Sequence, residues 1–382
     1  MSHSVTSLMD RIVKKMSGKT FSTLYQKGFS LVEMLITIAI FSVLLSGIFG
    51  AYFSQLDHTT REYKVAESEI ELSIAKRIIE QDLQMAGYGL ADEYPAATGF
   101  SPMPVDLTNG IVAGTPGGWD ELHLRGTALG QLNRASQGWS YVSDFDTSTP
   151  PKPILKPWGD PREQVEDDDR IVLIDPSSKT LQTDTGGEWI FKVTDNGTTT
   201  DIVHLDGTGL TDDVGKGTLV YGLYNSSTHD ASTTLQPYYT VHYSLGGASP
   251  SICAPGTASL LRGESVINDD PVGQPLMACV LDFQVAMGLD ISAPLDGMVN
   301  VWDDDNSIVG GFTRDNMNDQ LKRIKVYLLV QSGNRDSDYT YPIKDVLVGE
   351  AGIGGRTIEL TDEQRKYHWR LVTLSVQPRN IR

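Results

Sequence analysis

The chain has 382 residues, which exceeds the usual size of one domain and leaves ample length for a hydrophobic core. Apolar residues make up 40% and charged residues 21%, a globular composition that excludes wholesale disorder. The formal net charge of -18 disfavours nucleic acid as a partner, because phosphate contacts require clustered Lys and Arg. Two cysteines exclude a disulfide-dense scaffold and a multi-cysteine zinc or iron–sulfur module.

Charge is divided sharply along the chain. Residues 1–28 carry five basic side chains and one acid, whereas the remaining 354 residues hold 26 basic and 48 acidic side chains. An uncharged run of 20 residues follows from Met34 to Phe53, and as a helix it would span roughly 30 Å, the thickness of a bilayer core. Positive charge before this run places the amino end in the cytoplasm, so we expect the rest of the chain to be exported.

Two ordinary interpretations compete for this segment. A cleaved secretory signal would have a shorter apolar run and a small-x-small cleavage site, and residues 54–57 offer no such site. A simple uncleaved anchor explains the length and the orientation. It does not explain Glu33, the fifth residue of the apolar run that begins at Phe29, because an intramembrane carboxylate is costly and usually has a specific partner.

Residues 27–33 read Lys-Gly-Phe-Ser-Leu-Val-Glu and precede the long apolar run, and they resemble the class III signal of type IV prepilins. The resemblance implies cleavage after Gly28 by a prepilin peptidase on the cytoplasmic side, and methylation of the new amine on Phe29. Glu33 then becomes the fifth residue of the mature chain, where that family carries a glutamate. We expect its carboxylate to pair with the amino-terminal cation of a neighbouring subunit in a dry helical bundle, where attraction is weakly screened.

After Phe53 the pattern becomes amphipathic. With no proline in residues 29–94, we predict one helix over residues 29–89, continuous to about Met85 and stopped by Gly87 and Gly89. Residues 29–53 form its transmembrane half, and residues 54–89 form an amphipathic half that packs on a folded domain. A coiled coil is the alternative, which three heptads are too few to establish. One apolar stripe repeats every seven residues and consists of Val65, Leu72, Ile79 and Ala86. A second, adjacent stripe repeats every four residues and consists of Ile70, Ile74 and Ile78.

Residues 82–88 read Asp-Leu-Gln-Met-Ala-Gly-Tyr. They resemble the end of the long helix in PilW-type minor pilins, which carry an acid-Leu-x-x-Ala-Gly-Tyr pattern there. The GspJ-type pseudopilins of type II secretion resemble the segment more loosely. The alternative is simply a capped amphipathic helix.

Residues 90–382 are predicted to form an exported, β-rich globular head. Residues 91–118 and 148–161 are rich in Pro and Gly, which predicts loops. Short β-type runs follow from residue 169 onward, and the last ones, residues 321–332 and 367–377, also resemble the closing part of PilW-type proteins. We therefore predict an α+β, pilin-like fold, with the long helix packed on a mainly antiparallel sheet. The clearest runs are 170–174, 189–193, 202–205, 219–224, 238–243, 280–287, 324–330 and 369–376.

Cys253 and Cys279 both lie in the exported part, where disulfides persist. Closing their 26-residue separation would stabilise the fold by roughly 3–4 kcal/mol in the chain-entropy treatment, so we expect a disulfide, with two free thiols as the alternative.

Asp303 and Asp305 begin like a calcium-binding loop, but the segment lacks the glycine and the closing glutamate of an EF-hand. Solvated acidic turns are the favoured interpretation there, calcium is the alternative, and no other cofactor is expected.

Catalytic signatures are missing from the sequence, which has no G-x-S-x-G, H-E-x-x-H or C-x-x-C pattern. The six histidines after residue 53 lie at least 13 residues apart, and without a fold that gathers them we interpret each as structural. An enzyme is therefore not expected.

The leading hypothesis is a minor pilin that is matured by prepilin peptidase and primes type IV pilus assembly at the tip. Its expected partners are the peptidase, other minor pilins, the major pilin and the inner-membrane assembly platform. The expected location is the inner membrane, crossed once with a cytoplasmic amino end and a periplasmic head, and then the pilus tip. The alternatives are a pseudopilin of type II secretion and a membrane-anchored adhesin or binding module.

Overall fold

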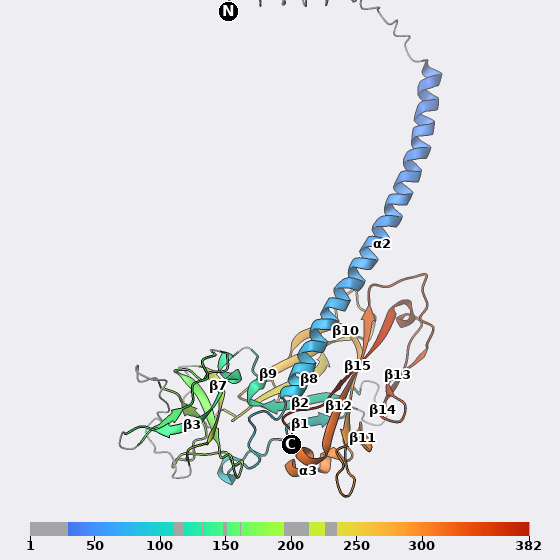
Figure 1. The fold of residues 1–382 in the computed structure, drawn as a ribbon. Coiled ribbons are helices and arrows are strands. Elements are labelled where there is room, and N and C mark those ends of the chain that lie inside the picture. Colours follow the sequence, from blue (N-terminus) through green and yellow to red (C-terminus); the bar gives the residue numbers. More distant parts are fainter. Residues whose placement is uncertain are drawn as a thin grey trace, which may run out of the picture. The chain divides into compact units, whose positions relative to one another are not determined.

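A computed structural model describes residues 30–110, 118–131, 133–147, 151–160, 162–194, 214–225 and 235–381. The chain divides into two compact units, Met1–Thr60 and Arg61–Arg382. The long helix α2, drawn in blue in Figure 1, extends from Leu31 to Met85 and contributes to both units. By length and composition, α2 is the one described helix that could cross a membrane.

The second unit is built on a main antiparallel sheet with the strand order β1-β2-β8-β9-β10-β12-β15, in which β11 pairs with β10. Every described pairing in it is antiparallel, and β10, with 16 residues, is its longest strand. The strands are β1 (Val105–Thr108), β2 (Glu121–Gly126), β8 (Tyr239–Gly246), β9 (Ala258–Ser265), β10 (Gln274–Leu289), β11 (Val301–Asp303), β12 (Leu321–Ser332) and β15 (His368–Val376).

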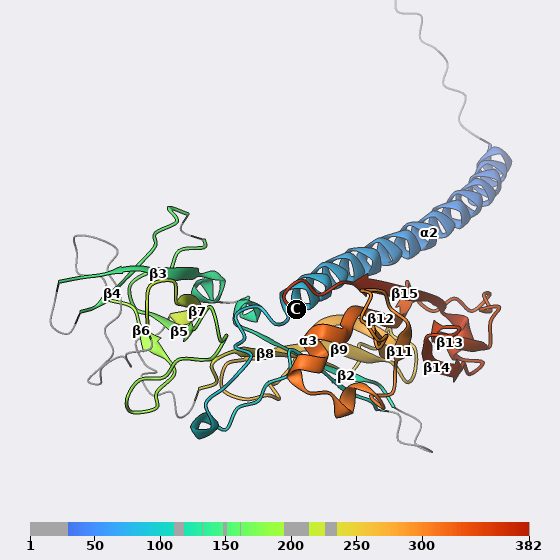
Figure 2. The same ribbon diagram turned by 60° about the horizontal axis from the view of Figure 1, so that its bottom comes forward.

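The carboxyl half of α2 packs on this sheet (Figure 2). Leu72, Ala75, Ile79 and Leu83 recur at helical spacing and are buried in one core with the inward-facing side chains of the strands. The stripe that repeats every seven residues is therefore the packing face from Leu72 onward. Part of the second predicted stripe faces outward, since Ile70 remains 62% exposed. The predicted α+β, pilin-like fold with a mainly antiparallel sheet is confirmed.

Two smaller β-structures complete the second unit. A five-stranded sheet of order β4-β3-β7-β5-β6 contributes side chains to a separate hydrophobic core, and β13 and β14 form a hairpin. These strands are β3 (Trp139–Phe145), β4 (Pro153–Leu155), β5 (Asp169–Ile174), β6 (Phe191–Lys192), β7 (Leu219–Asn225), β13 (Asp345–Glu350) and β14 (Gly354–Glu359). The short helix α3 (Arg314–Gln320) is capped at its amino end by Thr313. Single-turn 3-10 helices cover Ala96–Thr98, Thr127–Leu129, Arg134–Gln137, Val309–Gly311 and Gln364–Lys366.

Two loop predictions need correction, because the β-structure begins well before residue 169. Strand β1 lies within the predicted loop 91–118, and β4 lies within the predicted loop 148–161. Both strands are short and lie among prolines, and β4 begins with Pro153 at a sheet edge, the position in which a strand tolerates proline. The predicted run 202–205 lies outside the described residues.

Candidate functional site

The first turn of α2 forms a reciprocal capping arrangement. The hydroxyl oxygen of Ser30 accepts a hydrogen bond from the backbone N–H of Val32 at 3.3 Å. The carboxylate of Glu33 accepts one from the backbone N–H of Ser30 at 3.1 Å. A Ser-x-x-Glu sequence favours such amino-terminal capping, because both side chains satisfy N–H groups at the helix start. Glu33 is therefore held at the positive end of the helix, whereas Gly28 and Phe29 lie outside the described residues.

The helix that follows this turn presents apolar side chains on all sides. Val32 is 61% exposed, Phe41 is 60% exposed and Phe53 is 60% exposed. The most hydrophobic window of α2 has none of its residues buried. A helix that is apolar all round requires a covering of lipid or of other apolar helices.

The last turns of α2 are joined to the main sheet by a buried carboxylate, Asp82, which is 1% exposed. The Tyr243 hydroxyl donates a hydrogen bond to its Oδ2 atom at 2.5 Å, and Arg262 Nε donates to the same oxygen at 2.7 Å. Gln131 Nε2 donates to Oδ1 at 2.9 Å. Donors from β8, β9 and the 129–131 segment thus converge on one helix side chain, as a buried charge requires.

The electrostatics of this cluster depend on the ion pair. Burial opposes the charge of Arg262, but Asp82, Tyr243 and Glu264 together outweigh it and raise the pKa of the guanidinium above its ordinary value. At Asp82 burial outweighs the opposing effect of Arg262 and raises the pKa of the carboxyl above its ordinary value. Burial and the Asp82 charge also raise the pKa of the Tyr243 hydroxyl, so Tyr243 stays a donor. Arg262 also donates to Glu264 at 2.6 Å and to the Leu129 carbonyl at 3.2 Å. The guanidinium is therefore satisfied on several sides.

The residues after the helix explain the rest of the Asp82–Tyr88 pattern. Ala86 is fully buried in the core, and the Gly87 N–H donates to a carbonyl of β2 at 2.8 Å. Gly87 has a φ of 83°, and a Cβ atom there would lie 2.9 Å from the Asn380 carbonyl oxygen, so both conformation and space favour glycine. The Tyr88 ring packs edge-on against Tyr221 of β7 at a centroid distance of 5.2 Å. The pattern therefore describes how the helix end is fixed to both sheets.

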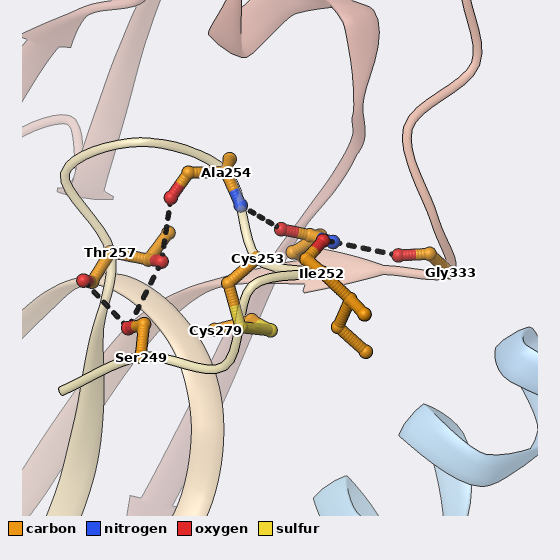
Figure 3. The surroundings of a disulfide bond; sticks show 8 residues. Ser249, Ile252, Cys253, Ala254, Thr257, Cys279 and Gly333 are labelled. Atoms are coloured by element: carbon orange, nitrogen blue, oxygen red, sulfur yellow. Dashed lines mark hydrogen bonds between the residues drawn. A yellow bond between two sulfur atoms is a disulfide. The ribbon is translucent and has the colours of Figure 1, made fainter.

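A disulfide joins Cys253 to Cys279 (Figure 3). Cys253 lies in the connection between β8 and β9, and Cys279 lies in β10. The Gln331 side chain of β12 holds the same loop, because its oxygen accepts the Ala254 N–H at 2.6 Å and its nitrogen donates to the Ile252 carbonyl at 3.1 Å. The bond therefore fastens a surface loop to the centre of the sheet.

The two calcium candidates lie in a tight turn. Oδ2 of Asp303 accepts the backbone N–H groups of Ile308 and Val309 at 2.9 and 2.6 Å. Oδ1 of Asp303 and Oδ1 of Asp305 both accept the N–H of Ser307, at 3.1 and 3.0 Å. These bonds describe carboxylates that stabilise the turn, and calcium binding here stays a prediction.

The structure brings together two histidines that the sequence leaves 119 positions apart. His123 of β2 and His242 of β8 stack with a ring-centroid distance of 4.2 Å, and Asp270 Oδ1 lies 3.0 Å from His242 Nδ1. The sequence carries no local signal for this group, because β2 and β8 are neighbours only in the folded sheet. The fold thus gathers two of the histidines that lie far apart in the sequence, and their interpretation as structural stays a prediction.

Comparison with family models matches residues 24–49 to the prokaryotic N-terminal methylation motif. No curated protein and no solved structure matches the chain. The matched segment contains Gly28, Phe29 and Glu33 and runs into the exposed apolar part of α2. The amino-terminal segment is therefore prepilin-like, and it supports anchoring in a membrane through α2.

Proposed function

We propose that this protein is a minor pilin that primes assembly at the tip of a type IV pilus. Prepilin peptidase cleaves it after Gly28 and methylates the new amine of Phe29. The observation that carries the proposal is the methylation motif over residues 24–49, followed directly by a helix whose apolar side chains are uncovered. Lipid covers that helix before assembly, and the helices of neighbouring subunits cover it afterwards. The role is structural, without catalysis.

Glu33 sets the axial register between neighbouring subunits in this assembly. Cleavage after Gly28 creates a cationic amine one residue before Ser30, whose N–H already donates to Glu33. The negatively charged Glu33 carboxylate is costly in an apolar environment unless it has a positively charged partner. Between packed helices, the amino-terminal amine of an adjacent subunit can be that partner. A carboxylate at one fixed depth in every subunit therefore selects one axial register between them.

The head favours a position at the end of the filament. A shaft subunit repeats many times, and each copy would have to accommodate the full bulk of residues 61–382 around the helical core. A tip subunit meets that constraint only once. Within this unit the Asp82 cluster fixes the last turns of α2 to the main sheet.

The proposed partners are prepilin peptidase, other minor pilins, the major pilin and the inner-membrane assembly platform. Before assembly the protein is located in the inner membrane, with its head in the periplasm, and it then enters the pilus. A pseudopilin of type II secretion is the second candidate, because the same motif and helix serve that machinery. The plain anchor for an adhesin explains the exposed helix but leaves Glu33 and the methylation motif without a role.

Immunogold labelling of sheared filaments tests the position. We expect antibodies against the head to label one end of a filament, because only the terminal copy carries this bulk. Antibodies against the major pilin serve as the control and should label the whole shaft. Regular labelling along the shaft, or label confined to membranes, would contradict the tip role.

A further inference from the structure

One face of the main sheet carries a row of polar side chains across β1, β2 and β8. Asp106 pairs with His123, and His123 pairs with His242, so the three side chains lie side by side in the direction of the hydrogen bonds. The neighbouring residues Leu122 and Tyr243 point to the opposite face and are buried in the core under α2. The row therefore lies on the face turned away from the helix.

The next position in the row, on β9, is Gly263. A Cβ atom there would lie 2.5 Å from the Pro271 carbonyl oxygen, so the β9–β10 connection occupies the space of the missing side chain. Asp269 fastens this connection, since its Oδ1 accepts hydrogen bonds from Arg125 Nε at 3.0 Å and from Thr240 at 2.7 Å. This packing brings the following residue, Asp270, to the edge of the His242 ring.

The resulting group has the dimensions of a metal site. One candidate ligand atom each from His123, His242 and Asp270 lies within 4.8 Å of the others. Asp270 Oδ1 and His242 Nδ1 are 3.0 Å apart, close to the roughly 3.3 Å that separates two ligands of a tetrahedral zinc ion. The two rings stack in parallel, with centroids 4.2 Å apart and an angle of 3° between them, so one ring must rotate about its side-chain bonds before both imidazoles direct a nitrogen at the same ion.

The ring nitrogens are prepared for such a role. His123 Nδ1 and His242 Nε2 are buried and have no hydrogen-bond partner among the described residues. Glu121 Oε2 lies 3.5 Å from His242 Nε2, where it can accept the second ring proton and orient the imidazole.

We propose that His123, His242 and Asp270 bind a divalent transition-metal ion, with zinc as the expected occupant. Two imidazoles and one carboxylate favour zinc over calcium, because calcium requires six or more oxygen ligands. Asp270 is 84% exposed at its side chain, so the ion enters from solvent and completes its coordination with water. Arg125 does not oppose the ion strongly, since its charge is paired with Asp269 and Asp106.

Calorimetric titration of the detergent-solubilised full chain with zinc chloride tests the proposal, after treatment with EDTA and without a histidine tag. We expect one zinc ion per chain. His123→Gln and His242→Gln should each weaken binding more than tenfold, and Glu121→Gln, which only orients His242, should weaken it roughly tenfold. His368→Gln is the matched control, because His368 stacks on Tyr339 of another loop and should leave the affinity unchanged.

A second readout separates ligand loss from misfolding. Zinc should raise the unfolding temperature of the parent chain, and it should not raise that of Asp270→Asn, whose exposed side chain contributes no packing. The parent and Asp270→Asn should unfold at the same temperature in EDTA. The proposal is overturned if the parent binds no zinc, if both glutamine variants bind it as tightly as the parent, or if equimolar calcium displaces it.

Discussion

Replacing Glu33 by alanine is expected to reduce incorporation of the protein into filaments by about tenfold or more, while cleavage after Gly28 continues. The carboxylate lies at the head of a helix segment with no buried residues, so its loss leaves the amine of a neighbouring subunit without a partner between apolar helices. Quantitative immunoblots of sheared filaments and of membranes measure the two pools. Equal incorporation of Glu33→Ala and the parent would contradict the charge pairing.

Glu33→Gln distinguishes that role from helix capping. In the structure Glu33 also accepts the Ser30 N–H, and a glutamine at this position accepts the same hydrogen bond without the charge. If the charge matters, Glu33→Gln should fail in assembly as severely as Glu33→Ala. Normal assembly of Glu33→Gln alongside failure of Glu33→Ala would assign Glu33 to capping alone.

Replacing Asp82 by alanine is expected to destabilise the head by about 3–5 kcal/mol, because it leaves the guanidinium of Arg262 buried without its counter-charge. The Tyr243 hydroxyl and the Gln131 amide lose their acceptor in the same step. Thermal or urea unfolding of the detergent-solubilised full chain measures the loss. Glu71→Ala is the matched control, since Glu71 lies on the same helix in an exposed position and should change stability little.

A double variant tests the mechanism behind this loss. Asp82→Leu combined with Arg262→Met removes both charges and keeps apolar volume, so it should be markedly more stable than Asp82→Ala. If Asp82→Ala unfolds like the parent, or if the double variant is no more stable than Asp82→Ala, the buried ion pair does not fasten the helix to the sheet.

The long helix and the fold class could be predicted because their signals are local. Apolar spacing from Leu72 to Ala86 and the glycine at position 87 predicted both the packing face and the helix end. The acid at position 82 was recognised only as part of a resemblance. Its function depends on Tyr243 and Arg262, which lie more than 150 residues away and reach it through the sheet order.

Strand β1 and the His123–His242 pair could not be predicted either, because both depend on contacts between residues that are distant in the sequence. Strand β1 has four residues, too few for a clear alternating pattern, and it is defined by its pairing with β2. The pairing of His123 with His242 arises because β8 returns beside β2 after more than 100 residues, which include the strands of the second sheet. The space that Gly263 leaves for the β9–β10 connection at Pro271 depends on tertiary packing, which the spacing of residues in the chain does not encode.

The mature amino terminus is the most direct test of the central claim. Mass spectrometry of the protein isolated from cells with an active prepilin peptidase should find an amino-terminal peptide that begins at Phe29 with a methylated amine. Cells without the peptidase provide the control and should yield the uncleaved form. A chain that keeps residues 1–28 in the presence of the active peptidase would contradict the claim and support a plain membrane anchor.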